Sequence, residues 1–512
     1  IPAVISKTSG VVNYNNTDAD FKLASNLDKS QINIEGKIKD NNIDVKFASD
    51  KFNLGDGLNT LPSAAKIPYK KDLAAINAGF NGRYNGSIQD INFDNIYLKG
   101  KIYSNKLSKS VIAVDNSSFE LNNSTFKLPL LKGSFKNSPY SISLNISKMF
   151  SPQRVVNGNC KITSLDLNLI NDNALQYILP PETAKQLKDI DFLNGNINLA
   201  AKIKNNNLNA YTKLDDISLF YKPKRLKLTI NSGDMLLRNN LLRLNKINAL
   251  LGKMPVFING EIANVQKNPN FNLYINAKPT QEFFDQFFNN KSVYPIKLKG
   301  DAILTSTLRG TPDYLNAKST FNISDNSSLY YMGASIGDAE NPVKITADTT
   351  YSPDRLRINN FQYDKIITSQ NNKPFVNPQL TAQGTINLIS DNIIGFNNFR
   401  VKTQTPTDAK IFNIIFRKPF MKQGVFTSDL ILNGTSVNPK IKGEMDITSI
   451  DIPFFDSTIR DINLDFKNDK IIIESKGTVV TNDVYLDAVV KNQLIPPYTV
   501  QDLKVKLADL NI

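Results

Sequence analysis

Two pairs of carboxylates are the residues of this sequence whose types and spacing could do acid–base chemistry. Asp215 and Asp216 are adjacent, and Asp461 and Asp465 are four positions apart. Two carboxylates that flank a sugar bond can hydrolyse a glycoside. However, Asp461 and Asp465 alternate with apolar residues, which predicts the polar face of a strand, and the pattern around Asp215-Asp216 predicts a turn. We therefore interpret both pairs as solubilising groups.

The sequence contains no histidine, the side chain that most often serves as general base and as zinc ligand. Neither a P-loop signature nor a GxGxxG turn is present, so no phosphate-binding loop is predicted. The single cysteine, Cys160, cannot form an internal disulfide, and its strand-like surroundings predict a small buried residue. These absences predict a protein that is not an enzyme and that uses no cofactor and no metal.

Phenylalanines gather between Thr280 and Asn289, in a segment whose pattern predicts a helix. They are Phe283, Phe284, Phe287 and Phe288. On a helix these side chains would share one side. The cluster predicts a helix packed on the rim of a sheet, or a gate over an apolar groove, or direct membrane contact.

The elements that position these residues are predicted to be strands, because apolar residues recur with period two along nearly the whole chain. Ile34 and Ile38, for example, alternate with polar residues, and a polar turn leads into Val45 and Phe47. Each strand then has one apolar and one polar face, as in an antiparallel sheet that is wetted on one side. The predicted fold class is all-β with few short helices: an elongated, repeat-like antiparallel sheet folded lengthwise into an apolar groove.

The apolar residues of these strands are predicted to line the groove. The residues singled out are Ile32, Ile34, Val45, Phe47, Ile197, Leu199, Ile203, Leu304, Leu308, Ile462, Leu464, Phe466, Val484 and Leu486. Short helical interruptions are predicted near residues 72–79, 173–190 and 280–289. Because nothing like a linker divides the chain, residues 1–512 are predicted to form a single elongated region, a fragment of a larger anchored protein.

The net charge of +14 fits nucleic acid, an anionic membrane surface or simple solubility. No block of five or more Lys or Arg exists, and the densest basic run, residues 221–228, alternates with leucines. Its charges are therefore predicted on the outer face of a strand. We predict no nucleic acid partner.

A longer and less regular sequence repeat contains these strands. In each repeat an alternating strand ends in an apolar residue, any residue and Gly, and a proline precedes the next strand. Residues 308–310 precede Pro312 in this way, and residues 432–434 precede Pro439. Glycines at such strand positions, Gly36 and Gly100 among them, fit bulges or tight bends. In these repeats, and in a helical segment that leads into a strand starting at Gly195, the sequence resembles the AsmA/TamB superfamily of bridge-like lipid transfer proteins.

The resemblance implies a trough that conducts phospholipid acyl chains between the inner and outer membranes and serves outer-membrane biogenesis. It implies phospholipids or other acyl lipids as partners, membranes at both ends, and a periplasmic location with an inner-membrane anchor outside this chain. Membrane-protein partners remain unknown. The alternative is a structural or adhesive β-solenoid of a cell surface, whose interior would be filled with side chains and leave no room for lipid.

Overall fold

The computed structural model describes most of the chain, and all structural statements below concern the described residues. These are residues 5–58, 75–104, 112–170, 189–222, 225–265, 267–289, 295–331, 333–337, 341–368, 374–390, 393–411, 424–435, 438–452, 457–467, 469–479, 482–492 and 499–507. The chain forms two compact units, residues 1–247 and 248–512. Each unit is described by itself.

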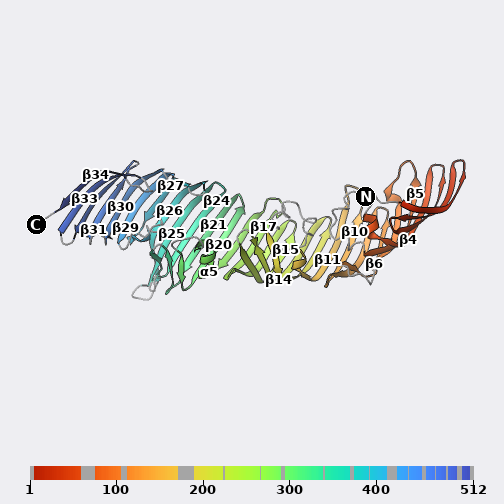
Figure 1. Ribbon diagram of the computed structural model, residues 1–512, viewed down its shortest axis with the longest axis horizontal. Helices are drawn as coiled ribbons and strands as arrows, with labels where there is room; N and C mark the ends of the chain where they lie inside the picture. The colour runs from red at the N-terminus through yellow and green to blue at the C-terminus, as the bar shows by residue number, and fades with distance from the viewer. Residues whose placement is uncertain are drawn as a thin grey trace. The chain divides into compact units, whose positions relative to one another are not determined.

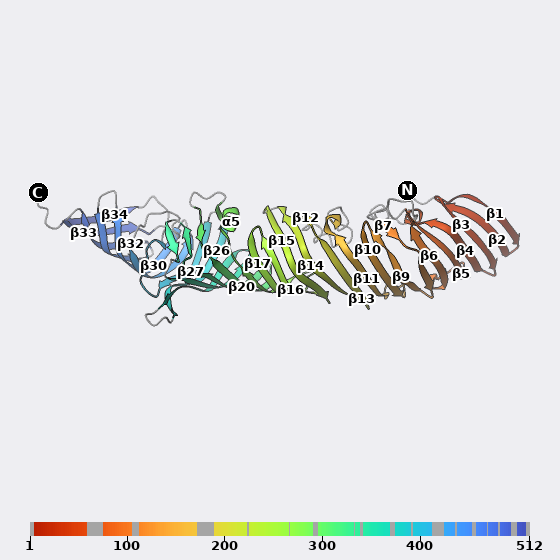
Figure 2. The ribbon, with the colours of Figure 1, turned by 90° about the horizontal axis from the view of Figure 1, so that it is seen from below.

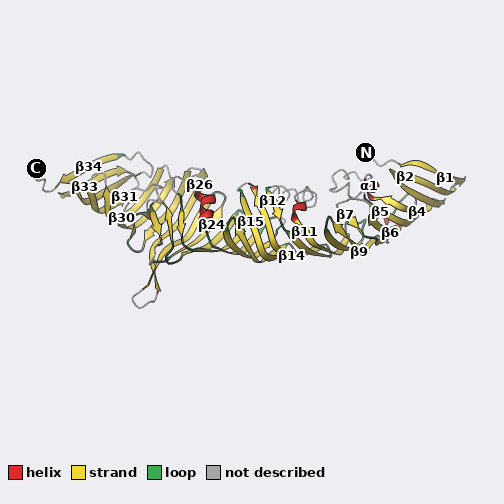
Figure 3. Cartoon of the chain, turned by 60° about the horizontal axis from the view of Figure 1, so that its bottom comes forward, coloured by secondary structure: helices red, strands yellow, loops and turns green. Residues whose placement is uncertain are grey.

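The predicted all-β class is confirmed. In the described part of the chain, 31 strands belong to one long antiparallel sheet that does not close on itself, and three strands form a small separate sheet. Figures 1 and 2 show the strands of each unit lying side by side, and Figure 3 shows that helix is confined to short segments.

The first unit contains the strands up to β15, while β16 crosses the division between the units. The strands are β1 (Ile5–Asn15), β2 (Asp18–Leu27), β3 (Ser30–Lys39), β4 (Asn42–Asn53), β5 (Ile76–Ser87), β6 (Ile96–Ser104), β7 (Ile112–Val114), β8 (Ser117–Asn122), β9 (Thr125–Phe135), β10 (Ser138–Ser147), β11 (Val155–Asp166), β12 (Ile190–Asn194), β13 (Asn196–Lys204), β14 (Asn207–Tyr221), β15 (Leu226–Arg238) and β16 (Leu241–Leu251). Its helical turns are α1 (Leu54–Leu58), η2 (Phe93–Asn95) and η3 (Leu167–Ile170).

The second unit contains the remaining elements. They are β17 (Met254–Ala263), β18 (Asn270–Ala277), α5 (Gln281–Phe284), η5 (Asp285–Asn289), β19 (Lys297–Lys299), β20 (Ala302–Thr311), β21 (Tyr314–Ile323), β22 (Ser328–Tyr331), β23 (Ala334–Ile336), β24 (Val343–Ser352), β25 (Arg355–Thr368), β26 (Pro374–Ser390), β27 (Ile393–Thr403), β28 (Thr407–Asp408), β29 (Val425–Thr435), β30 (Asn438–Ile452), β31 (Ser457–Phe466), β32 (Lys470–Val479), β33 (Asn482–Lys491) and β34 (Val500–Leu507). β19, β22 and β23 make the small sheet.

Two-residue turns join many neighbouring strands, and their residues explain the hairpins. Asp40 and Asn41 join β3 to β4 with φ of 47° and 65°, and Asn205 and Asn206 join β13 to β14 with φ of 49° and 66°. Positive φ at both central residues matches the twist of the flanking strands, and Asn and Asp tolerate it best among residues with a side chain. The frequent asparagines of this sequence thus set the strand order locally.

The predicted helix over residues 72–79 is wrong for its described part. Residues 76–79 begin strand β5, in which Ile76 and Ala78 are buried and lie opposite Ser104 and Ile102 of β6. Pairing with a neighbouring strand and burial outweigh the weak local preference for helix. Residues 72–74 lie outside the described residues.

The other two predicted helical segments have different outcomes. Most of the segment 173–190 lies outside the described residues, and its last residue, Ile190, starts strand β12. The segment 280–289 is helical, as α5 and the π-helical turn η5. Thr280 caps α5, since its side chain accepts a hydrogen bond from the Phe283 amide at 3.3 Å.

The buried apolar side chains form a cluster in each unit. In the first unit, Ala78, Phe119 and Leu128 are buried together between β5, β8 and β9. The cluster of the second unit is larger and draws on strands from β20 to β32. Its most deeply buried members, Phe426, Ile323 and Val343, expose 2% or less of their surface.

Candidate functional site

The apolar face of the first unit runs unbroken across neighbouring strands. Strand register aligns Leu23, Ile34, Phe47, Gly82, Leu98 and Leu121 in one row from β2 to β8. A second row joins Phe21, Gly36, Val45, Tyr84 and Ile96. Residues that are directly opposite in an antiparallel pair share a face, so both rows lie on the same side of the sheet.

This apolar face is partly open to solvent. Ile32, Ile34, Val45 and Phe47 are half-buried, whereas their sequence neighbours on the other face, such as Glu35, are exposed. The same alternation holds in β13, where Ile197, Leu199 and Ile203 are half-buried. A closed core would bury these side chains fully, so the first unit presents apolar surface along these strands.

Glycines on the apolar face lie beneath aromatic rings of the neighbouring strand. A Cβ on Gly36 would collide with the ring of Phe21, and a Cβ on Gly100 would collide with the ring of Phe119. Each glycine is directly opposite its aromatic partner in a regular register. The prediction that Gly36 and Gly100 mark bulges or bends is therefore wrong, because these glycines make room for rings that lie flat on the sheet.

The opposite face of the first unit carries paired charges. The Arg83 guanidinium donates to both carboxylate oxygens of Asp44, at 2.8 and 2.6 Å, across the β4–β5 pair. This hydrogen bonding holds the pKa of the Asp44 carboxyl below its ordinary value. Lys37 and Asp20 form a looser pair, 3.4 Å apart. The sheet of this unit thus has one apolar and one charged face, as the alternation predicts.

The apolar face of the second unit also follows the register. One row joins Ala277, Leu304, Phe321, Ile345, Tyr363 and Leu380 from β18 to β26. Farther along the chain, another row joins Met445, Leu464, Ile473 and Ala488 from β30 to β33. As in the first unit, each row consists of apolar residues that lie directly opposite one another on neighbouring strands.

Burial distinguishes the predicted lining residues of the second unit. Ile462 exposes 6% of its surface within the large core, and Leu464 and Phe466 pack against that core. Leu304 and Leu308 in β20 are half-buried, and so are Val484 and Leu486 in β33. Of these positions, Ile462 is therefore buried core, whereas Leu464 and Phe466 of β31 are partly buried beside it, as Val484 and Leu486 are in β33.

The small sheet covers part of the apolar surface of the second unit. Leu298 of β19, Leu329 of β22 and Ile336 of β23 pack against the large core. Beside it, Gln281 of α5 accepts a hydrogen bond from the Leu298 amide at 2.6 Å, and Asn289 of η5 bonds the backbone of Ile296. The helical segment is thus tied to the small sheet by its polar side chains.

Of the predicted gate residues, two can be located in detail. Phe284 is buried, and its ring contacts that of Phe283 edge to face, with centroids 5.6 Å apart. Phe287 and Phe288 lie in η5, and their side chains are outside the described part of the structure. The small sheet, which sequence reasoning missed, covers apolar surface of the large core and is bonded to Gln281 of α5.

The carboxylates and the cysteine considered for chemistry do not gather into one site. Asp216 lies inside strand β14, with φ of 49°, and not in the predicted turn, while Asp465 forms an ion pair with Lys467 at 3.1 Å. Cys160 is half-buried in β11, and burial raises the pKa of its thiol. Among the described residues, no cluster of three or more His, Cys, Asp or Glu could hold a metal ion.

No family model, curated protein or solved structure matches this chain. Within the described ranges, no helix combines the length and the apolar character needed to cross a membrane. The resemblance to the AsmA/TamB superfamily stays a prediction.

Proposed function

We propose that this chain is a bridge-like lipid transfer protein that carries acyl chains on the apolar faces of its strands. The observation that supports the proposal is the unbroken row of apolar residues from β2 to β8, in which Leu23, Ile34, Phe47 and Leu98 are half-buried. An exposed apolar surface that is continuous over many strands marks a binding surface.

The energetics favour a continuous row over a single pocket. Each CH₂ group that is sheltered from water gains about 0.8 kcal/mol. A lipid that moves along a surface of equivalent apolar rows keeps this gain at every step, because each new row replaces the contacts that the previous row loses. Movement then needs no cofactor, and the headgroups stay in water at the open side.

The cellular setting follows the AsmA/TamB resemblance and is part of the proposal. The chain would work in the periplasm between the inner and outer membranes, held at the inner membrane by a segment outside these residues. Phospholipids would be its cargo, and the two membranes its partners.

Site-specific photo-crosslinking tests the proposal. A photoreactive residue at Ile34 should capture phospholipid in cells, and one at Glu35, next in the strand but on the charged face, should not. Lipid analysis of the purified chain should find co-purifying phospholipid. Equal labelling at both positions, or a chain that is consistently free of lipid, would contradict the proposal.

A structural role is the second candidate, and the packed core of the second unit favours it. Phe426, Ile323 and Val343 are fully buried there, and the small sheet covers neighbouring apolar surface. Side chains fill this region as they would in a scaffold or solenoid. Crosslinkers at Ile462 would separate the two roles. Lipid capture at this buried position requires the core to open, and its absence beside capture at Ile34 confines lipid to open surfaces.

A further inference from the structure

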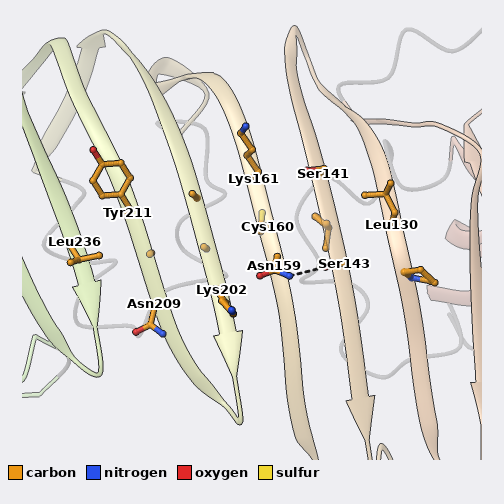
Figure 4. A pocket seen from close by; sticks show the side chains of 15 residues that line it. Leu130, Ser141, Ser143, Asn159, Cys160, Lys161, Lys202, Asn209, Tyr211 and Leu236 are labelled. Atoms are coloured by element: carbon orange, nitrogen blue, oxygen red, sulfur yellow. Dashed lines mark hydrogen bonds between the residues drawn. The ribbon is translucent and has the colours of Figure 1, made fainter.

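A depression of about 570 Å³ lies on the polar face of the first unit, across β9, β10, β11, β13, β14 and β15. Figure 4 shows the lining side chains, which come from adjacent strands. Its polar groups are the hydroxyls of Ser141, Ser143 and Tyr211 and the amides of Asn159 and Asn209. The depression belongs to the face opposite the apolar rows, so the proposed lipid surface does not use it.

The strand register places these groups in two neighbouring rows. One row runs from Ser143 through Asn159 and Lys202 to Asn209, and the Asn159 amide donates to the Ser143 hydroxyl at 3.3 Å. The other row runs Ser141, Lys161, Ala200, Tyr211 and Leu236. Ala200 leaves space between the long side chains on either side of it.

The charge of the depression is positive. Lys161 and Lys202 are diagonal neighbours on β11 and β13. The Cα atoms of such neighbours are about 7–8 Å apart in the usual sheet geometry. No Asp or Glu is among the residues that line the depression, all of which the structure describes. Uncharged residues lie directly opposite both lysines on each side.

Further cationic residues flank this pair. Lys132 lies opposite Ser141, and Arg238 lies opposite Asn209, both exposed. The nearest acidic residue along β15, Asp234, lies opposite Lys213, beyond the Tyr211 end of the depression. Lys161 and Lys202 thus lie within the depression and Lys132 and Arg238 at its two ends, and the amides and hydroxyls between them lie beside the apolar side chains of Leu130 and Leu236.

We propose that this depression binds an anionic saccharide, a sugar that carries phosphate or carboxylate groups. The lysines would pair with the anionic groups, and the serine hydroxyls and asparagine amides would bond the sugar hydroxyls. Tyr211 exposes 44% of its surface and offers a ring face against which a sugar can lie. An isolated phosphate would use the lysines alone and leave the remaining groups unused.

Binding of a phosphorylated oligosaccharide to the full chain, measured by calorimetry at constant salt, tests the proposal. The same oligosaccharide without phosphate, inorganic phosphate alone and phosphatidylglycerol vesicles serve as comparison probes. The phosphorylated sugar should bind at least tenfold more tightly than either small probe. Equal binding of inorganic phosphate, or binding of vesicles alone, would overturn the proposal.

Matched variants locate the site. Lys161→Gln with Lys202→Gln should weaken binding at least tenfold, and Tyr211→Ala should weaken it while Tyr211→Phe retains most of it. Lys99→Gln with Lys101→Gln removes the same charge from exposed positions of β6, outside the depression, and should leave binding unchanged. If both lysine pairs have the same effect, the binding reflects general charge and the proposed site is wrong.

Discussion

Phe47 lies directly opposite Gly82 across the β4–β5 pair, and its ring occupies the space that a Cβ on Gly82 would fill. The ring covers backbone that a glycine would otherwise leave exposed, an arrangement used to stabilise glycine within sheets. Gly82 itself is buried beneath it. The pair keeps the apolar row continuous at a position that has no side chain.

Gly82→Val should destabilise the β4–β5 region by about 1–3 kcal/mol, because the new side chain displaces the Phe47 ring. Combining it with Phe47→Ala should recover part of the loss, since the space then becomes free. Hydrogen exchange of the β4 and β5 amides measures the effect in the full chain. Asn81→Val, on the exposed face beside Gly82, should change stability by less than about 0.5 kcal/mol. If the destabilising effects of Gly82→Val and Phe47→Ala simply add in the double variant, the two residues are not in direct contact.

Introducing a carboxylate should have opposite consequences in the two units. Ile34→Asp should leave the first unit folded, because the half-buried position gives the charge access to water, but should reduce lipid capture by neighbouring crosslinkers. Ile462→Asp, in the buried large core, should unfold its surroundings, since an unpaired buried charge costs several kcal/mol. Protease sensitivity of each variant reports local unfolding. An Ile462→Asp chain that resists protease as well as the unmodified chain would show that this position is open.

Tyr140 should make stability depend on alkaline pH. Its hydroxyl donates to the Ala113 carbonyl at 2.9 Å, and burial, with a smaller effect of the Asp115 charge, raises its pKa to about 12. An unfolded tyrosine titrates near pH 10, so the folded chain holds this proton more tightly. The stabilisation is complete below about pH 10 and is lost as the pH rises through about 12. The stability difference between the unmodified chain and Tyr140→Phe, about 1 kcal/mol at neutral pH, should shrink over that range in denaturant titrations.

The Arg400–Asp429 pair in the second unit should make the stability of the unit depend on pH in the acid range. The guanidinium bonds both carboxylate oxygens, at 2.7 and 2.5 Å, and lowers the pKa of Asp429. This pair stabilises the unit above the ordinary Asp pKa, near 3.9, and the effect is lost as the pH falls through the lower folded value. Arg400→Gln should cost less than about 1 kcal/mol at pH 7, because the side chains are 43% and 40% exposed. Once the pH is low enough to protonate Asp429 in the folded chain, the two chains should melt alike, and a persisting difference would mean that Arg400 stabilises by packing.

The alternation of Ile32 and Ile34 with polar residues predicted a strand with one apolar face, and the structure has that strand. This succeeds because the period of two is a local property of extended backbone. The same pattern could not distinguish Ile34, which is half-buried, from Ile462, which is core. The difference depends on which distant strands curl over or cover a position.

The prediction of a helix over residues 76–79 was wrong for a related reason. Their local sequence suits a helix, but β4 and β6 provide open strands on both sides, and pairing with them decides the conformation. The depression near Lys161 was also invisible in the sequence, because its lysines and amides come from strands separated by tens of residues. A pattern of small residues opposite lysines would have been its only signal.

Most strands of the sheet pair with the strand that precedes or follows them in the sequence, often across a two-residue turn. Closing such short loops costs little entropy, and isolated hairpins form within microseconds. The contact order of this large β protein is therefore low, unlike that of sandwiches, whose strands must wait for distant partners. The N-terminal hairpins can form while the rest of the chain is still being synthesised, and each later strand adds to an edge that already exists.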